Sequence, residues 1–477
     1  KIMSDNREPN TQSKYDVAVI GAGSAGFSAA ITAADEGAQV ALIGYGTIGG
    51  TCVNVGCVPS KALIRAAETL HVASAAKRFD GIEAFAKVTN WKAAVEQKQA
   101  LVDDLRKAKY ADILPAYTSV AYLEGEAKFS DGGALTVDGA TIDAKKIIIA
   151  TGTRPAMPSI DGIQSVPYLT STSALELQEL PESLLVIGAG YIGAEIAQIF
   201  ARAGVKVTIV SRRGLLPETE PEIGEALSGY FQDEGINMVS GITYDHITTK
   251  DGSIVLTVKD GNGPWEIVAD KVLIATGRTP NTESLNLSEA GIEVAANNGI
   301  KVDAQMRSTR EGVYAAGDVT GRDQFVYMAG YGAKIAAKNA LNGNSLSYDN
   351  STMPAVVFTD PQIASVGLTE AEAKSLGYEV RTSVLTLDNV PRALAARDTR
   401  GLIKLVADGK TGKLIGGHIL APEGADSIQT VAMAIKAGMT YQEFGAMIFP
   451  YLTTVEGLKL AAQTFDMDVK KLSCCAG

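Results

Sequence analysis

The sequence predicts an α/β fold with two Rossmann-like dinucleotide-binding domains and a third, α+β domain at the C-terminus. Two segments far apart in the chain each show an apolar strand, a Gly-x-Gly-x-x-Gly turn and a helical stretch. Beyond residue 351, apolar strands at 355–358, 402–406 and 414–419 alternate with helices. The length of 477 residues agrees with three domains of roughly 150 residues each.

The first repeat begins with a strand at 15–20 and continues into an Ala-rich helix that ends at Glu36, followed by a strand at 39–43. The intervening glycines permit a tight turn, close approach to a pyrophosphate and close packing of the helix. The helix N-terminus offers N–H groups and a positive dipole end to the phosphates. Gly44 follows the second strand, so the acidic residue that usually binds the ribose is missing there.

The second repeat has a strand at 184–187, a helix ending at Ala203 and a strand at 206–210. Arg212 and Arg213 follow that last strand, where an acidic residue would favour the 2′-hydroxyl of NAD. Arginines can pair with a 2′-phosphate, which favours NADP. The alternative is a solvated basic turn.

The four cysteines form two close pairs, Cys52/Cys57 and Cys474/Cys475. So few cysteines exclude a disulfide-stapled secreted scaffold. Cys52 and Cys57 lie at the start of a predicted helix near Lys61, a setting that favours a reactive thiolate and a small redox disulfide. Two buried structural cysteines are the alternative. A zinc site is disfavoured, because no nearby Cys or His cluster completes four ligands.

Charge and hydropathy exclude several classes of protein. A net charge of −11 argues against a general nucleic-acid binder. Residues 1–14 have no apolar core of a secretory signal, and we expect residues 1–12 to form a flexible leader. The most apolar stretch, 184–200, contains Glu195 and is shorter than the ~20 residues of a membrane helix. We therefore expect a cytoplasmic protein without a membrane partner.

The string Gly-Gly-Thr-Cys-Val-Asn-Val-Gly-Cys-Val-Pro-Ser-Lys at 49–61 resembles the flavin disulfide reductases. Further matches are the segments 150–152, 275–281 and 314–318, and the resemblance extends from about residue 15 to residue 477. It implies FAD and NADPH as cofactors and a homodimer. The implied domains are FAD-binding at 13–169 and 281–348, NADPH-binding at 170–280, and a dimerisation domain at 351–477.

The resemblance also implies roles for individual residues. Cys57 would lie against the flavin, with Cys52 as the outer, substrate-facing thiol. Lys61 and Glu195 would pair beside the flavin, and Asp318 would bind its ribityl chain. The predicted cofactor-binding residues are Gly21, Gly23, Ser24, Ala25, Gly26, Gly50, Thr51, Lys61, Thr151, Gly152, Gly188, Gly190, Tyr191 (over the nicotinamide pocket), Ile192, Glu195, Arg212, Arg213, Gly277, Arg278, Gly317 and Asp318.

The C-terminal segment bears on the choice of substrate. Members of the family that reduce organic disulfides carry a His-x-His-Pro-Thr-like segment whose second His is the acid/base group. Here Tyr451 stands in its place. A tyrosine, with an ordinary pKa of about 10, is a poor proton shuttle at neutral pH. The three histidines of the chain, at 71, 246 and 418, lie outside this segment, and we expect them to be structural.

Cys474 and Cys475 place two adjacent thiols at the chain end. Thiolates select soft metal ions, of which Hg(II) is the extreme case. This ending, together with Tyr451, resembles the Hg(II)-reducing members of the family. We expect NADPH-dependent, FAD-mediated reduction of Hg(II) to Hg(0). Hg(II), arriving as thiolate complexes, would pass from Cys474 and Cys475 of one subunit to Cys52 and Cys57 of its partner.

Two aromatic residues complete the expected Hg(II) site. Tyr110, in the helical stretch after Trp91, would flank the ion together with Tyr451. The alternative for Tyr110 is an ordinary helix-surface tyrosine. For the whole protein, the alternatives are a large-type thioredoxin reductase and a non-catalytic protein that sequesters soft metals.

Overall fold

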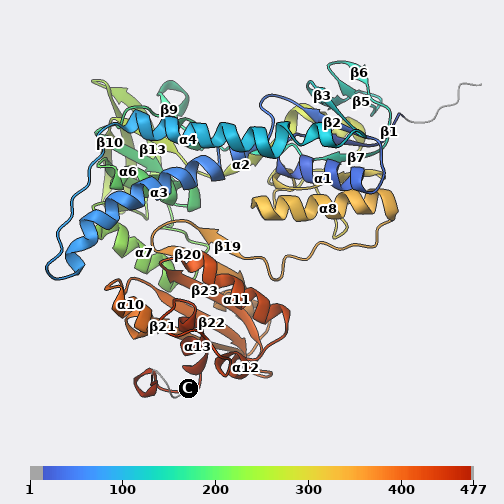
Figure 1. Cartoon of the computed structure of the whole chain (residues 1–477). Helices are drawn as coiled ribbons and strands as arrows, with labels where there is room; N and C mark the ends of the chain where they lie inside the picture. The colour runs from blue at the N-terminus through green and yellow to red at the C-terminus, as the bar shows by residue number, and fades with distance from the viewer. Residues whose placement is uncertain (1–13, 474–477) are drawn as a thin grey trace, which may run out of the picture. The chain divides into compact units, whose positions relative to one another are not determined.

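The computed structural model describes residues 14–473 (Figure 1). The described chain divides into two compact units. Unit 1 contains the chain up to Val58 together with Ala100–Arg154 and Arg278–Asp349, and unit 2 contains the rest. The leader predicted at 1–12 lies outside the described residues.

Unit 1 is built on a parallel five-stranded sheet in the order β18-β7-β1-β2-β3. Its strands are β1 (Tyr15–Ile20), β2 (Val40–Gly44), β3 (Val120–Glu124), β7 (Ala144–Ile149) and β18 (Val313–Ala315). The central strands are almost wholly apolar because both faces of the sheet are covered. Helices α1 (Ser24–Asp35) and α8 (Val326–Asn342) pack on one face and lie side by side in Figure 1. The small antiparallel sheet of β4 (Ala127–Phe129), β5 (Leu135–Val137) and β6 (Ala140–Thr141) packs on the other.

Unit 2 contains a second parallel sheet, in the order β12-β11-β10-β16-β9. Its strands are β9 (Tyr168–Leu169), β10 (Ser183–Ile187), β11 (Lys206–Val210), β12 (Asn237–Val239) and β16 (Lys271–Ile274). Helices α6 (Tyr191–Arg202) and α7 (Pro221–Asp233) share one apolar core with this sheet. The antiparallel sheet of β13 (Thr243–Lys250), β14 (Ser253–Asp260) and β15 (Gly263–Ala269) packs on the opposite face.

The C-terminal part of unit 2 has an antiparallel sheet in the order β19-β20-β23-β22-β21. Its strands are β19 (Ala355–Val357), β20 (Gln362–Gly367), β21 (Val380–Thr386), β22 (Leu402–Asp408) and β23 (Leu414–Ala421). Helices α11 (Gly424–Lys436), α12 (Tyr441–Gly445) and α13 (Glu456–Gln463) cover it and complete an apolar core.

The remaining helices and strands connect these layers. Helix α3 (Cys57–Ser74) and helix α4 (Trp91–Arg106) both cross from one unit into the other along the chain. The shorter elements are α2 (Gly50–Asn54), α5 (Ser171–Ala174), α9 (Glu370–Ser375), α10 (Pro391–Ala395), β8 (Thr153–Pro155) and β17 (Arg278–Pro280).

The predicted fold class is confirmed: each Gly-x-Gly-x-x-Gly turn joins a buried parallel strand to a helix, and the chain ends in an α+β region. The domain boundaries given above stay a prediction. Within residues 14–473, no helix is both long enough and apolar enough to cross a membrane.

Glu234, just after α7, is held by two neighbouring helices of unit 2. Its carboxylate accepts hydrogen bonds from Arg202 Nε and Gln198 Nε2, each at 2.8 Å, and lies 3.0 Å from His71 Nδ1. Burial raises the pKa of Glu234, but the hydrogen bonds and the charge of Arg202 outweigh burial and lower the pKa from 4.5 to about 2. The charged carboxylate therefore stabilises the fold of unit 2 at neutral pH.

We predict that Glu234→Gln lowers the free energy of unfolding at pH 7 by about 3 kcal/mol, because Arg202 loses one of its two carboxylate partners and keeps Asp360. A lowered carboxyl pKa stabilises above the unfolded value, so the wild type should lose this advantage as the pH falls from 4.5 towards 2. Urea unfolding from pH 7 to pH 3.5 measures the difference in the free energy of unfolding between the wild type and Glu234→Gln. Exposed Glu225→Gln on α7 is the control. A difference that stays constant across that pH range would contradict a stabilising role of the charged Glu234 carboxylate.

Candidate functional site

In unit 1, the glycine-rich turn between β1 and α1 is arranged to receive an anion. Helix α1 begins at Ser24, with Gly23 as its N-cap residue and no side chain capping its end. Its first turn, which includes Ala25 and Gly26, contains no acidic residue. The N–H groups at this end therefore face no competing carboxylate, as a pyrophosphate site requires.

The cysteine segment is joined directly to this turn. The N–H of Gly49 donates to the carbonyl of Ala22 at 2.8 Å. Gly50 has a φ of 71°, and a Cβ atom at this position would lie 2.5 Å from the Cα of Gly23. Only glycine allows such an approach of two backbones. The contact fixes the position of α2, which carries Thr51 and Cys52, relative to the turn between β1 and α1.

Cys52 lies on α2 and Cys57 is the first residue of α3; both side chains are half-buried. Asn54, between them, donates from Nδ2 to the carbonyls of Ile48 and Gly50, each at 2.9 Å. Arg106 Nη1 donates to Asn54 Oδ1 at 2.9 Å. Asn54 and Arg106 were not among the predicted site residues. The signal for Asn54 was its position inside the cysteine string, whereas Arg106 is 49 residues beyond Cys57 and has no local signal.

Tyr110 is brought to the cysteine segment by a π-helical turn, Lys107–Ala111, that follows α4. Its hydroxyl lies 3.2 Å from Ser24 Oγ, and its ring meets Phe27 edge to face, with centroids 4.8 Å apart. Burial raises the pKa of Tyr110; the Ser24 hydrogen bond opposes this, while the negative charges of Cys52 and Cys57 add to it. Tyr110 is therefore a neutral hydroxyl near both thiols, not a helix-surface residue.

Asp318 lies beside the same turn of unit 1. Gly317 precedes it with a φ of 79°, and a Cβ atom there would lie 2.9 Å from the Cβ of Ala25 on α1. Thr153 Oγ1 donates to Asp318 Oδ2 at 3.2 Å and accepts from Arg278 Nε at 2.8 Å. Burial raises the pKa of Asp318, with Thr153 and Arg278 opposing the rise. Thr153 was not predicted; it follows Thr151 and Gly152, which were.

Thr151 and Gly152 connect β7 to residues near β17. The Thr151 hydroxyl donates to the carbonyl of Asn281 at 2.8 Å, and the Asn281 N–H donates to the carbonyl of Gly152 at 2.9 Å. These residues, Asp318 and the uncapped α1 end lie at the carboxyl ends of parallel strands, where α/β sheets bind ligands. The uncapped turn and the half-buried acid fit a dinucleotide with a polyhydroxy chain, as FAD has.

In unit 2, the second glycine turn has the same construction. Helix α6 begins at Tyr191, followed by Ile192, with Gly190 as its uncapped N-cap residue and no acid in its first turn. Gly188 follows the carboxyl end of β10, and Gly277 follows the carboxyl end of β16 in the same sheet. The turn fits the pyrophosphate of a second dinucleotide.

Glu195 on α6 is 3% exposed and is satisfied on both oxygens. Lys61 Nζ lies 3.0 Å from Oε2, and the N–H of Phe358 donates to Oε1 at 2.9 Å. Lys61 also lies over the Phe358 ring, 4.8 Å from its centroid. The predicted Lys61–Glu195 pair is therefore formed, and Lys61 lies four residues, about one turn, after Cys57 on α3. Phe358 was missed because its contribution is a backbone N–H.

Arg212 and Arg213 follow β11 and are both exposed. Arg212 lies over the ring of Tyr244, 5.3 Å from its centroid, and Arg213 Nη2 lies 2.6 Å from Glu218 Oε1. Both contacts are at the surface, so the two guanidinium groups stay accessible to a phosphate.

Tyr451 is 51% exposed, in the turn before α13. The turn is closed by Leu452, whose N–H donates to Glu456 Oε2 at 3.0 Å. Cys474 and Cys475 lie outside the described residues.

All three histidines lie outside the turn of Tyr451 and have structural partners. His71 contacts Glu234, and His246 on β13 contacts Asp245 at 2.7 Å. His418 on β23 is buried and lies 2.9 Å from the carbonyl of Leu368. Burial lowers the pKa of His418. Over residues 14–473, no group of three or more His, Cys, Asp or Glu side chains is arranged to hold a metal ion.

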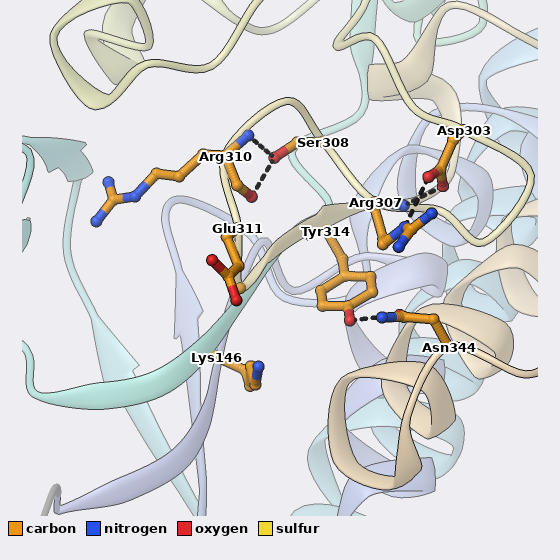
Figure 2. A pocket seen from close by; sticks show the side chains of 9 residues that line it. Lys146, Asp303, Arg307, Ser308, Arg310, Glu311, Tyr314 and Asn344 are labelled. Carbon is orange, nitrogen blue, oxygen red and sulfur yellow. Dashed lines mark hydrogen bonds and ion pairs between the residues drawn. The ribbon is translucent and has the colours of Figure 1, made fainter.

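A pocket in unit 1 contains none of the predicted site residues (Figure 2). It lies near Lys146 of β7 and Gly312 just before β18, at the amino ends of parallel strands. Its charges are mixed and partly paired, as in the 2.7 Å contact of Arg307 Nε with Asp303. The residues lining it are Lys146, Asp303, Arg307, Ser308, Arg310, Glu311, Gly312, Tyr314 and Asn344. We assign the cofactor site to the opposite, carboxyl edge of the sheet.

Comparison with known proteins agrees with this geometry. Residues 15–334 match the family described as pyridine nucleotide-disulphide oxidoreductase, and residues 353–462 match its dimerisation domain. The mercuric reductase of Lysinibacillus sphaericus is 46% identical over 468 residues, covering 98% of this chain and 85% of that protein. The mercuric reductase of Streptomyces lividans is also 46% identical, covering 97% of this chain and 98% of that protein.

A solved structure is similar over most of the chain. The HOCl-induced flavoprotein disulfide reductase RclA of Escherichia coli, as a Cu(II) complex, aligns with a TM-score of 0.84 at 31% sequence identity. The alignment covers 95% of this chain and 100% of that chain.

The Lys61–Glu195 pair gives a prediction that needs no cofactor. Lys61→Met should lower the free energy of unfolding of the apoprotein by about 2–3 kcal/mol, because the buried Glu195 carboxyl loses its cationic partner. Lys61→Met combined with Glu195→Met should recover part of the loss, and exposed Lys77→Met should have no effect. Urea unfolding of the four proteins measures this. A double variant less stable than Lys61→Met would contradict it.

Proposed function

The chain belongs to the pyridine nucleotide-disulphide oxidoreductase family, and on this premise we propose that it reduces Hg(II) to Hg(0) with NADPH. It is an oxidoreductase of the mercuric reductase type and uses FAD and NAD(P)H. The observation that carries the choice of substrate is a thiol pair near a neutral tyrosine hydroxyl, with a tyrosine again at the position of the family's acid/base histidine.

The thiols of Cys52 and Cys57 supply ligands that suit Hg(II). Thiolates select soft ions, and Hg(II) is satisfied by two sulfur atoms. An ion held by thiolates moves from one thiol pair to another by ligand exchange, which requires no imidazole to carry a proton. Disulfide reduction does require one, because a thiolate leaves and must be protonated.

The cofactors supply the redox chemistry. When bound, FAD and NADPH provide two-electron transfer, in which oxidation of NADPH to NADP⁺ and H⁺ balances reduction of Hg²⁺ to Hg⁰. In unit 1, the uncapped α1 turn, Thr51 and Asp318 would hold FAD. In unit 2, the α6 turn with Tyr191 would hold the nicotinamide dinucleotide, and Arg212 and Arg213 would bind the 2′-phosphate that distinguishes NADPH from NADH.

The two tyrosines would flank the ion as neutral groups. The raised pKa keeps the Tyr110 hydroxyl protonated at neutral pH, so it can donate a hydrogen bond near the thiolates. Tyr451 is exposed in its own turn, which suits a residue that acts on a bound substrate. We propose that Tyr451, Cys474 and Cys475 of one subunit serve the Cys52/Cys57 pair of the partner in a homodimer. A cytoplasmic location stays a prediction.

The deciding experiment measures NADPH oxidation by the FAD-loaded protein with Hg(II) in excess thiol, beside glutathione disulfide and thioredoxin. We expect oxidation to depend on Hg(II) and to be at least tenfold slower with either disulfide. Hg(0) release, measured as mercury vapour, should equal the NADPH consumed. Thioredoxin-dependent turnover without Hg(II) turnover would favour the thioredoxin reductase alternative, and absence of both would contradict the proposal.

The same assay tests delivery by the tail. Cys474→Ala combined with Cys475→Ala should slow turnover most when mercury is supplied bound to thiols. In this variant, no tail thiols are present to take Hg(II) from the small thiol complex. Equal turnover of this variant and the wild type under that condition would contradict tail delivery, while leaving Hg(II) reduction itself untouched.

Cofactor choice gives a separate prediction. Arg212→Ser combined with Arg213→Ser should raise the KM for NADPH at least tenfold and leave that for NADH within about twofold, because only NADPH carries the 2′-phosphate. Lys206→Ser, which removes an exposed positive charge at the opposite end of β11, is the control. Equal effects on both nucleotides would contradict the assignment.

A further inference from the structure

Gly44 ends β2 and is buried. In a dinucleotide-binding βαβ unit, the residue about 20 positions after the glycine turn is an acid that binds the adenosine ribose hydroxyls. Gly44 occupies that position and has no side chain. The ribose of a dinucleotide on the α1 turn would therefore find no carboxylate on β2.

The neighbouring strand fills the space that such a side chain would need. A Cβ atom on Gly44 would overlap the hydroxyl oxygen of Tyr122 and lie 2.8 Å from its Cζ and 2.9 Å from its Cε2. Tyr122 is half-buried on β3 and packs against the core beneath α1. Glycine at position 44 and tyrosine at position 122 are thus matched in shape.

Glu124 brings an acid to the same edge of the sheet. It is the last residue of β3 and the register partner of Gly44 in the parallel pairing of β2 with β3. Glu124 and Tyr122 are two positions apart, so they lie on the same face of their strand. Glu124 is exposed, and its negative charge adds to burial in raising the pKa of Tyr122. A hydroxyl and a carboxylate are therefore close together at the carboxyl end of β3.

We propose that Tyr122 and Glu124 of β3 bind the ribose diol of the FAD adenosine, in place of the usual carboxylate at the end of β2. The carboxylate of Glu124 accepts hydrogen bonds from the two ribose hydroxyls, and the neutral Tyr122 hydroxyl donates or accepts one more. The acid thus lies on β3 instead of β2, and Gly44 leaves the space that the Tyr122 ring occupies.

The test is the affinity of the apoprotein for FAD, measured by quenching of flavin fluorescence without NADPH or mercury. Glu124→Gln should weaken FAD binding roughly tenfold or more, because a charge-assisted hydrogen bond to the diol is lost. Glu126→Gln, which removes the same charge from an exposed residue just beyond β3, should leave the affinity unchanged. The outcome is independent of Hg(II) as the substrate.

An FAD analogue with a 2′,3′-dideoxyadenosine separates a ribose contact from a structural effect. Wild type and Glu124→Gln should bind this analogue with the same affinity, since it has no diol to lose. Gly44→Glu should weaken FAD binding by displacing Tyr122, and Gly44→Glu with Tyr122→Val should restore it. Unchanged FAD affinity in Glu124→Gln, or an equal loss with the dideoxy analogue, would overturn the proposal.

Discussion

The close approach of two backbones in unit 1, Gly23 to Gly50, is the constraint on which the rest of the candidate site depends. A side chain on either residue would push the cysteine segment away from the glycine-rich turn between β1 and α1. The hydrogen bond from Gly49 to Ala22 and the amide of Asn54 keep the segment in place. One contact thereby positions the thiols and the cofactor turn relative to each other, and preorganised placement of this kind is what two-electron chemistry between bound groups requires.

Two acidic side chains of the candidate site, Glu195 and Asp318, have different hydrogen-bond partners. Glu195 is buried with Lys61 on one oxygen and a backbone N–H on the other. Asp318, by contrast, is half-buried and accepts a hydrogen bond from the neutral hydroxyl of Thr153, and its pKa is raised. An acid in that setting is suited to hydrogen bonding with hydroxyl groups of a ligand. The two acids differ in role because their neighbours differ, although both belong to motifs that the sequence shows plainly.

The proposed substrate chemistry rests on Tyr451, which stands in the place of the family's acid/base histidine. Tyr110 stays neutral near the thiols, and each of the three histidines contacts a structural partner through at least one ring nitrogen. A thiol pair without a proton shuttle is poorly suited to breaking disulfides and well suited to passing a thiophilic ion. The similarity to mercuric reductases over nearly the whole chain agrees with the proposed function.

The fold class and the two glycine turns could be predicted from the sequence, because each depends on neighbouring residues and short-range periodicity. The sequence also indicated the missing acid at Gly44 and the missing histidine at Tyr451. The tertiary structure alone decided that Tyr110 lies near the thiols, that Phe358 completes the Glu195 site, and that Tyr122 occupies the space beside Gly44. These interactions join residues between 53 and 163 positions apart, from the electrostatic effect of Cys57 on Tyr110 to the hydrogen bond of Phe358 to Glu195. Only the pairing of strands and the packing of helices bring such residues together.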